Sequence, residues 1–280
     1  MTTLPTPELV ISGLRFPEGS RWHEGRLYFS DMHTGQVLAL DPDTTEVEEI
    51  ARLEGQPSGL GWLADGTLVV SSMLDNTVYR VMADKTLEPW TEVSHLTDWP
   101  TNELCVSPDG HGYLGGFGYD FYNEAPPEPG PVFHIHPDGT VELGADGFTF
   151  PNGTVVLPGT RTLVVAETWG HCLTAFDLAD DGSLENRREW AELWPSSTAD
   201  GIDADADHGI WISSIVEHVF VRVIEGGEVT HRIDMGDEYA VDCAVGGPDG
   251  KTIFLSTSNS WQPAETTIRA GNIYRVQIED

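Results

Sequence analysis

Six short motifs each place one polar or acidic residue directly before a segment with the pattern of a β-strand. They read FPEGSRW, QPSGLGW, PTNELCV, FPNGTVV, TADGIDA and AVDCAVG, and the third residue of each is its anchor: Glu18, Ser58, Asn102, Asn152, Asp200 and Asp242. The anchors recur at intervals of 40 to 50 residues. Oxygen-bearing side chains at one position of a repeat can share a cation if the fold brings the repeats together.

The predicted metal ligands are Glu18, Asn102, Asn152 and Asp200, whose two carboxylates and two amides match one divalent cation. Oxygen-only ligation selects a hard ion, and Ca²⁺ suits a cage of protein groups better than Mg²⁺. Mg²⁺, Mn²⁺ and Zn²⁺ stay open as alternatives. No His occupies an anchor, and no CxxC pair or Cys/His cluster suggests a zinc site elsewhere. A simpler reading is that Asn and Asp only serve the turns before the strands.

The elements that must position the anchors are short strands. A polar turn such as HEGR or PDGH follows each anchor, and a segment such as LYFSD or LVVSS comes next. Repeats of this length with about four strands are typical of propeller blades. We therefore expect an all-β fold, a six-bladed β-propeller forming a single domain over residues 1–280, with the N-terminal PELVISGL completing the last blade. The anchors and the loops after the second strands then meet at one mouth of the central channel.

The segments FPEGSRWHEGRLYFSD, FPNGTVV and ADGIDADADHGIWIS resemble the senescence marker protein/gluconolactonase/luciferin-regenerating-enzyme family, and the resemblance follows the same blade order over nearly the whole chain. It implies a divalent metal in the channel, lactone hydrolysis, metal ligands at Glu18, Asn152 and Asp200, and a substrate or metal contact at Asn102. Sugar-lactonase members carry an Arg where this chain has Pro100, and an Asp where it has Glu103. We therefore expect a substrate less polar than a sugar lactone.

Aromatic residues are frequent in the segments assigned to the channel mouth. Besides Asn102, the predicted substrate-binding residues are Trp99, Phe117, Tyr119, Trp169 and Trp261. Such a collar would form an apolar pocket above a polar floor, although aromatic residues also pack as core. The longest insertion, from Phe117 to Gly130, is either a solvated loop or a partial lid.

The favoured function is a metal-dependent lactonase or related esterase, in which the cation polarises the lactone carbonyl. Asp200 is the first candidate for the general base and Asp242 the second. Among the mouth histidines His33, His171 and His218, we single out His171 as a proton donor or acceptor. Organophosphate hydrolysis, a non-hydrolytic rearrangement and a non-catalytic Ca²⁺-binding propeller are the alternatives.

The charge balance limits the classes of binding partner that this protein can have. The 280 residues contain 14 Lys and Arg against 46 Asp and Glu, a net charge of −32. This charge argues against nucleic acid and anionic membranes as partners and leaves a small-molecule substrate, with the oligomeric state open. No run of 18 apolar residues and no secretory signal is visible. Three widely spaced cysteines, Cys105, Cys172 and Cys243, predict reduced thiols in a cytoplasmic protein.

Overall fold

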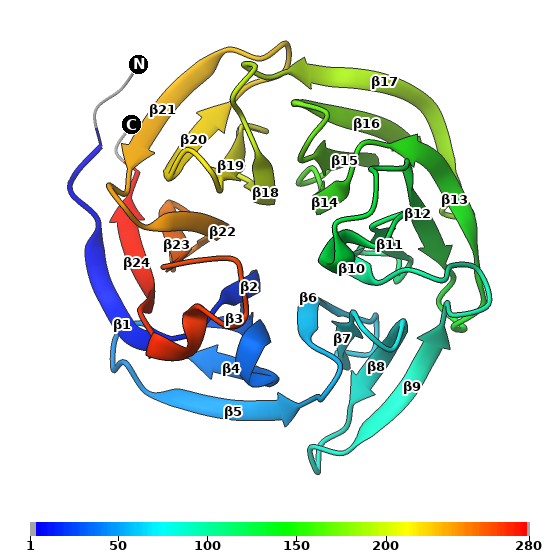
Figure 1. The fold of residues 1–280 in the computed structure, drawn as a ribbon, viewed down its shortest axis with the longest axis horizontal. Coiled ribbons are helices and arrows are strands. Elements are labelled where there is room, and N and C mark those ends of the chain that lie inside the picture. The colour runs from blue at the N-terminus through cyan, green and yellow to red at the C-terminus, as the bar shows by residue number, and fades with distance from the viewer. Residues whose placement is uncertain (1–3, 279–280) are drawn as a thin grey trace.

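Short antiparallel strands make up nearly all the regular structure of residues 4–278, the part of the chain that the computed structural model describes. They form six four-stranded antiparallel sheets, five of which are meanders of strands consecutive in sequence, while the sixth takes one strand from the other end of the described chain. Figure 1 shows the sheets in a ring, with one edge strand of each sheet nearest the centre. The predicted all-β, six-bladed propeller is confirmed.

The first three blades run from the inner strand outward in chain order. Blade one contains β2 (Pro17–His23), β3 (Arg26–Asp31), β4 (Gln36–Leu40) and β5 (Val47–Arg52). Blade two contains β6 (Pro57–Trp62), β7 (Leu68–Ser72), β8 (Thr77–Val81) and β9 (Leu87–Glu92). Blade three contains β10 (Thr101–Val106), β11 (Gly112–Gly116), β12 (Gly130–Ile135) and β13 (Val141–Phe148).

The other three blades repeat this order, except at the outer edge of the last. Blade four contains β14 (Pro151–Val156), β15 (Thr162–Glu167), β16 (Cys172–Leu178) and β17 (Leu184–Glu192). Blade five contains β18 (Ala199–Ala204), β19 (Ile210–Ser214), β20 (Val219–Val223) and β21 (Val229–Asp234). Blade six contains β22 (Tyr239–Gly246), β23 (Thr252–Ser258), β24 (Gly271–Gln277) and β1 (Glu8–Leu14).

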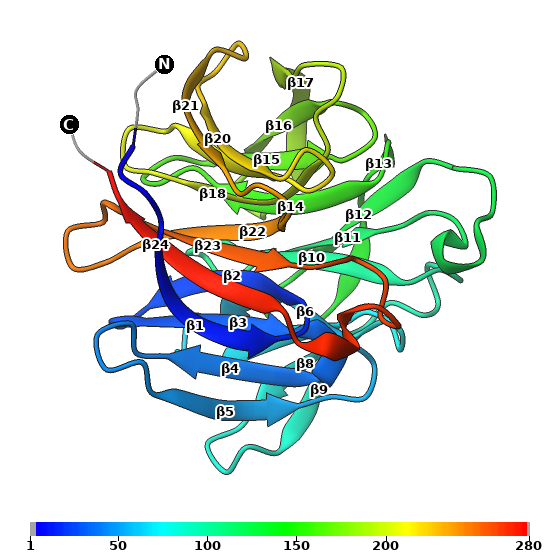
Figure 2. The same cartoon turned by 60° about the vertical axis from the view of Figure 1, so that its left-hand side comes forward.

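The outer strand of blade six comes from the opposite end of the chain. β1 pairs antiparallel with β24, placing Glu8 opposite Arg275, and Figure 2 shows the two strands side by side. The Arg275 guanidinium lies 2.9 Å from the Glu8 carboxylate. The pairing closes the ring, because the first and last strands of the described chain share one sheet.

Glycine follows the anchor in four of the six motifs, and the packing of the inner strands explains why. A Cβ at Gly59 would overlap the backbone nitrogen of Leu104 in the next blade, and a Cβ at Gly153 would lie 2.6 Å from the nitrogen of Ile202. Neighbouring inner strands thus approach more closely than a side chain allows. In blade three the corresponding residue is Glu103.

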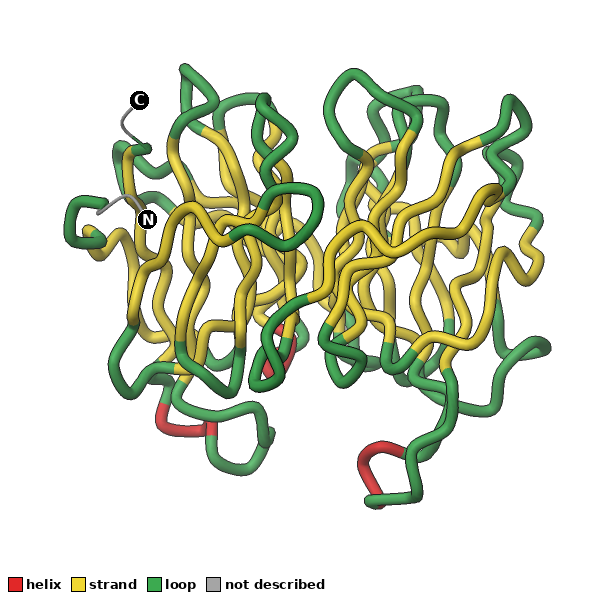
Figure 3. Tube along the Cα trace, turned by 90° about the horizontal axis from the view of Figure 1, so that it is seen from above, coloured by secondary structure: helices red, strands yellow, loops and turns green. Residues whose placement is uncertain are grey.

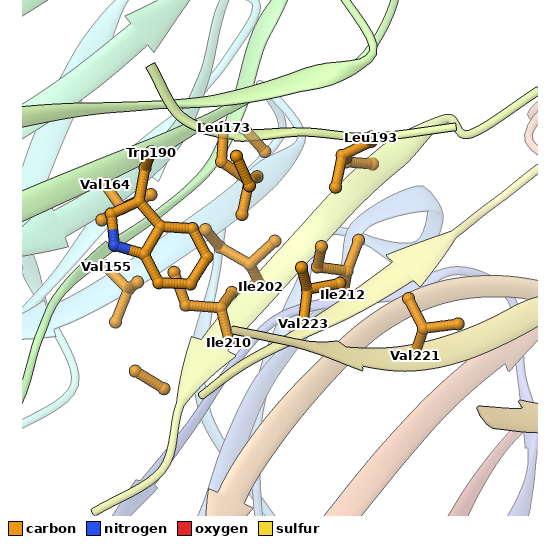
Figure 4. Packing of buried hydrophobic residues seen from close by; sticks show 14 of the residues in the cluster. Val155, Val164, Leu173, Trp190, Leu193, Ile202, Ile210, Ile212, Val221 and Val223 are labelled. Atoms are coloured by element: carbon orange, nitrogen blue, oxygen red, sulfur yellow. The ribbon is translucent and has the colours of Figure 1, made fainter. Parts of the chain in front are cut away.

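Apolar side chains fill the space between adjacent blades. Between blades four and five, Trp190 packs with Val155, Val164, Ile202 and Ile210, all less than a tenth exposed (Figure 4). The Val and Ile residues belong to strands in which successive side chains point to opposite faces of the sheet. Each blade therefore presents one of its faces to the next blade. Burial of each such side chain contributes on the order of 1.5–3 kcal/mol.

The loops after the second strands lie on one face of the ring. Three short 3₁₀ helices mark this face: η1 (Met32–Thr34) after β3, η2 (Phe121–Asn123) after β11 and η3 (Thr266–Ile268) after β23. Figure 3 shows all three on the same side of the strands. This common side is the channel mouth. Within residues 4–278, no helix has the length and apolar character needed to cross a membrane.

Replacing Gly153 by Ala is expected to force β14 and β18 apart and to destabilise the fold by about 1–3 kcal/mol, the usual cost of overpacking. Urea denaturation measures this change. Gly159→Ala is the control, because a Cβ there meets nothing within 4 Å although its φ of +68° still adds strain. Equal losses for the two variants would contradict the steric role of Gly153.

Raising the salt concentration is expected to raise the melting temperature, because the charge of −32 makes the folded chain repel itself. Between about 0.1 and 1 M NaCl the Debye length falls from about 10 to about 3 Å. A gain of about 2–4 °C accompanies each kcal/mol of relieved repulsion. Differential scanning calorimetry in NaCl and in KCl at equal ionic strength tests this, and a constant or falling melting temperature would refute it.

Candidate functional site

A cavity of about 410 Å³ opens at the channel mouth and is lined by residues from all six blades. Its polar lining includes the four predicted metal ligands, Glu18, Asn102, Asn152 and Asp200. Each lies near the start of its inner strand, and each is no more than 6% exposed. The strand geometry therefore gathers residues that are up to 182 positions apart in sequence.

The floor of the cavity is held by a few hydrogen bonds. Asn152 Nδ2 donates to Asp200 Oδ1 and, at 3.2 Å, to Thr168 Oγ1. Ser58 Oγ donates to Glu18 Oε2 at 3.3 Å, and Asn102 Nδ2 donates to the Pro151 carbonyl at 3.3 Å. The Asn152 Oδ1 atom is buried and has no hydrogen-bond partner. One strong acceptor therefore remains unsatisfied beside two carboxylates.

Buried like charges dominate the electrostatics of the floor. Burial and the nearby Asp200 charge hold the pKa of Glu18 well above its ordinary value. Burial and the Asp242 and Glu103 charges do the same to the pKa of Asp200. Clustered carboxylates and an unpaired amide oxygen are the donor set that a hard divalent cation satisfies. The residues present thus fit such an ion.

A second layer of charge lies behind the floor. Arg21 donates to Glu103 Oε2 at 2.9 Å and to the Leu104 carbonyl at 3.1 Å. Asp242 Oδ2 accepts from the Ser20 amide, and Asp242 Oδ1 is buried without a partner. Burial raises the pKa of Glu103 to about 7 although Arg21 opposes this change. Asp242 is fully buried and does not line the cavity, so its charge acts on the floor from behind.

Aromatic and sulfur-bearing side chains form the wall above the floor. Phe117 stacks on Phe150 with ring centroids 4.7 Å apart, and both are buried. Trp261 lies edge-on to Phe121 and Trp169, at 6.1 and 6.5 Å, and is 38% exposed. The wall therefore combines packed rings near the floor with rings that face solvent at the rim. Among the residues that the structure describes, no Lys or Arg lines this cavity.

Some predicted substrate-binding residues lie in the cavity wall and others do not. Phe117, Trp169 and Trp261 line the cavity together with Asn102. Tyr119 does not line it and is packed against Phe150 in the core of the mouth. Trp99 is 37% exposed and also lies outside the lining.

The histidine singled out from the sequence lies outside the cavity. His171 adopts a left-handed backbone conformation, with φ of 53°, and its Nδ1 donates to the Ser197 carbonyl at 2.6 Å. His33 instead lines the cavity, stacked on Phe16 at 4.8 Å. Its Nδ1 lies 2.9 Å from Thr266 Oγ1, and burial together with Arg15 lowers its pKa to about 4. His33 is therefore neutral at pH 7.

Two loops extend the wall outward. Phe121, Tyr122 and Glu124 of the long insertion line the cavity, so this segment partly covers the mouth. Residues 262–264, which follow Trp261, also line it. The sequence places Gln262 and Pro263 in the SNSWQP loop at the mouth, but their side chains gave no signal for a substrate contact.

Pro100 does not line the cavity. Its carbonyl accepts a hydrogen bond from the Phe117 amide at 3.0 Å, and its ring offers no donor to a substrate hydroxyl. The neighbouring Glu103 is occupied by Arg21. The polar groups of the lining lie in the floor and also, at the outer loops, at His33, Glu124 and Gln262.

One expectation from the sequence is wrong. No His cluster was expected, yet His111, His134 and His136 of blade three bring ring nitrogens within 4.8 Å of one another. The HIHP segment gave a signal, because residues two apart in a strand share a face. The third member is 23 residues away and is brought in only by strand pairing.

Known proteins resemble this chain over most of its length. The pentonolactonase XacC of Haloferax volcanii is 26% identical over 263 residues, which cover 89% of this chain and 84% of that protein. The structure of the calcium-binding protein regucalcin from Agrobacterium tumefaciens strain C58 matches with a TM-score of 0.84 at 18% identity, covering 100% of this chain and 96% of that one.

A luciferin-regenerating enzyme matches with a TM-score of 0.83 at 17% identity, covering 98% of this chain and 95% of that one. At such identities the two structures establish the fold. The SMP-30/gluconolactonase/LRE-like region matches residues 16–259, which hold all six anchors. The chain belongs to the SMP-30/gluconolactonase/LRE-like family.

Proposed function

We propose that this protein is a metal-dependent hydrolase that opens a lactone or related cyclic ester less polar than a sugar lactone. The observation that carries the proposal is the cavity itself, in which Glu18, Asn102, Asn152 and Asp200 form an oxygen-rich floor under an aromatic wall. The similarity to a pentonolactonase over 89% of the chain supports lactone chemistry. The volume of about 410 Å³ suits a small molecule.

The four floor residues would hold the metal, and the all-oxygen donor set favours Ca²⁺, with Mg²⁺ and Mn²⁺ as alternatives. When bound, a divalent cation supplies Lewis-acid polarisation of the substrate carbonyl. The unpartnered Asn152 Oδ1 and the raised pKa values of Glu18 and Asp200 support this assignment. Regucalcin, whose structure has the same fold, is a calcium-binding protein.

Asp200 is the proposed general base. Its Oδ1 accepts from Asn152 Nδ2, which orients the carboxylate and leaves Oδ2 to accept a proton from the attacking water. The Asp242 charge behind the floor strengthens Asp200 as a base. Water adds to the carbonyl carbon, the ring C–O bond breaks, and the ring oxygen takes up a proton to give the hydroxy acid. We keep Asp242 as an electrostatic partner, since it does not line the cavity.

The aromatic wall of the cavity would determine which substrates bind. Without Lys or Arg in the described lining, a carboxylate group on a substrate would lose water without a cationic partner. Phe117, Trp169 and Trp261 would instead bury its apolar part. We propose that His171 positions the loop through its bond to Ser197 and takes no part in proton transfer.

Two broader properties are also proposed. Residues 1–280 would act as one domain, because β1 and β24 tie the two ends of the chain into one blade. The chain would work in the cytoplasm, which the free thiols of Cys105, Cys172 and Cys243 favour.

The metal and base assignments predict different defects. Asp200→Asn should weaken metal binding and should lower kcat for lactones by about 10²–10⁴-fold even at saturating metal, the usual contribution of a general base. Glu18→Gln should weaken metal binding, and saturating metal should restore most of its activity. Activity on a panel of γ-, δ- and aryl lactones, measured with and without chelator, gives the readout. Glu225→Gln, an exposed carboxylate elsewhere, is the control.

Full activity after complete metal removal would overturn the metal dependence. Turnover of phosphotriesters with no turnover of any lactone would replace the proposed reaction. Metal binding without turnover of lactones, phosphotriesters or aryl esters would indicate a binding propeller.

The substrate assignment predicts that Trp169→Ala lowers kcat/KM for an alkyl-substituted lactone about tenfold or more, as loss of a hydrophobic contact does. The effect on gluconolactone should be smaller. Trp99→Ala removes the same side chain outside the cavity and should leave both values unchanged. Equal effects of the two Trp variants would argue against an apolar contact at Trp169.

A further inference from the structure

A histidine cluster lies in blade three, at the end of the blade opposite the channel mouth. β10 begins at the mouth with Asn102 and ends at Val106, so the turn that leads to His111 lies at the far end. His134 belongs to β12, and His136 follows that strand. The cluster is thus separate from the cavity and independent of the proposed function.

Strand pairing places the three rings together. Tyr113 of β11 and Glu142 of β13 both pair with His134, and all three side chains point to one face of the sheet. His111 and His136 are each two residues from this row and share the same face. One ring nitrogen of each histidine lies within 4.8 Å of the others.

The contacts within the cluster show which neighbour each ring nitrogen faces. His111 Nδ1 lies 2.9 Å from His134 Nε2. The other nitrogen of His134, Nδ1, lies 3.4 Å from Glu142 Oε1, and His136 Nε2 lies 3.3 Å from the same oxygen. A proton on His134 Nδ1 that faces Glu142 leaves Nε2 with a free lone pair toward His111. This carboxylate–histidine arrangement is the one that orients metal-bound imidazoles.

Two of the three histidines are buried. His134 is 1% exposed and His111 is 9% exposed. Burial, followed by the neighbouring His136, lowers the pKa of both rings below the ordinary value. Neutral imidazole is the form that binds a metal.

The neighbouring blade closes over the cluster. The Tyr113 ring stacks on His134 at 5.5 Å, and its hydroxyl donates to the Gly182 carbonyl at 2.8 Å. A Cβ at Gly182 would overlap the His111 ring, and φ there is +82°, which also favours glycine. The rings are therefore held in place from both sides of the interface between blades three and four.

We propose that His111, His134 and His136 form a second metal site, for a borderline cation such as Zn²⁺, with Glu142 as the carboxylate that orients His134. Three imidazoles and one open position are a donor set that Zn²⁺ accepts, at Zn–N distances of about 2.0–2.1 Å. Nitrogen ligation distinguishes this site from the oxygen floor of the channel. The rings would replace the His111–His134 contact by bonds to one shared ion.

The test is metal binding by the full chain stripped of metal. Zn²⁺ is titrated by calorimetry, and Co²⁺ is titrated while its visible d–d absorption reports nitrogen ligation. The wild type should bind one equivalent at this site, and Glu18→Gln should retain it. His136→Gln and His134→Gln should lose it, and Glu142→Gln should bind about 10–100-fold more weakly.

His208→Gln is the matched control, since His208 is an exposed histidine outside the cluster that donates to the Pro158 carbonyl. The side chain of His136 is 32% exposed, so His136→Gln is expected to fold even if His134→Gln does not. Circular dichroism of the metal-free variants checks this. If the wild type and His136→Gln bind Zn²⁺ with the same stoichiometry and affinity, and give the same Co²⁺ spectrum, the site does not exist.

Discussion

The close approach of the six inner strands is the constraint on which the rest of this structure depends. Strands that carry glycine beside the anchor can pack almost backbone to backbone, as Gly59 does against Leu104 and Gly153 against Asp200. The anchor side chains are thereby pressed into one small volume at the channel mouth. Any residue with a Cβ at these glycines would widen the ring and disperse the polar groups that it gathers.

This constraint explains the unusual electrostatics. Glu18 and Asp200 are buried together with Asp242 and Glu103, and Arg21 is the cation placed among them. Isolated burial of so many carboxylates is costly unless they are protonated or shared with a cation. The same arrangement, unfavourable for carboxylates alone, is the one that the proposed divalent cation would offset. The proposed function and the stability of the fold therefore make opposite demands on the floor. The apolar contacts between the blades offset the free-energy cost of burying its carboxylates.

The fold and the residues of the polar floor could be predicted from the sequence because both follow a periodic sequence pattern. The anchors recur once per blade, and the turn and strand that follow each of them recur with it, so position in the repeat predicts position in space. The wall was predicted less well, since Trp99 and Tyr119 lie outside the cavity. Loops do not follow the repeat, and a loop's side-chain directions depend on contacts that local sequence does not encode.

The sequence by itself determined the blades, their order and the positions of the polar anchors at their inner ends, because strand alternation and turn chemistry are local properties. The tertiary structure alone decided which mouth histidine faces the cavity, His33 and not His171. It also decided that His111 meets His134 and His136 across two strands. These outcomes depend on register and on packing between blades, which join residues far apart in the chain and leave no periodic trace in it.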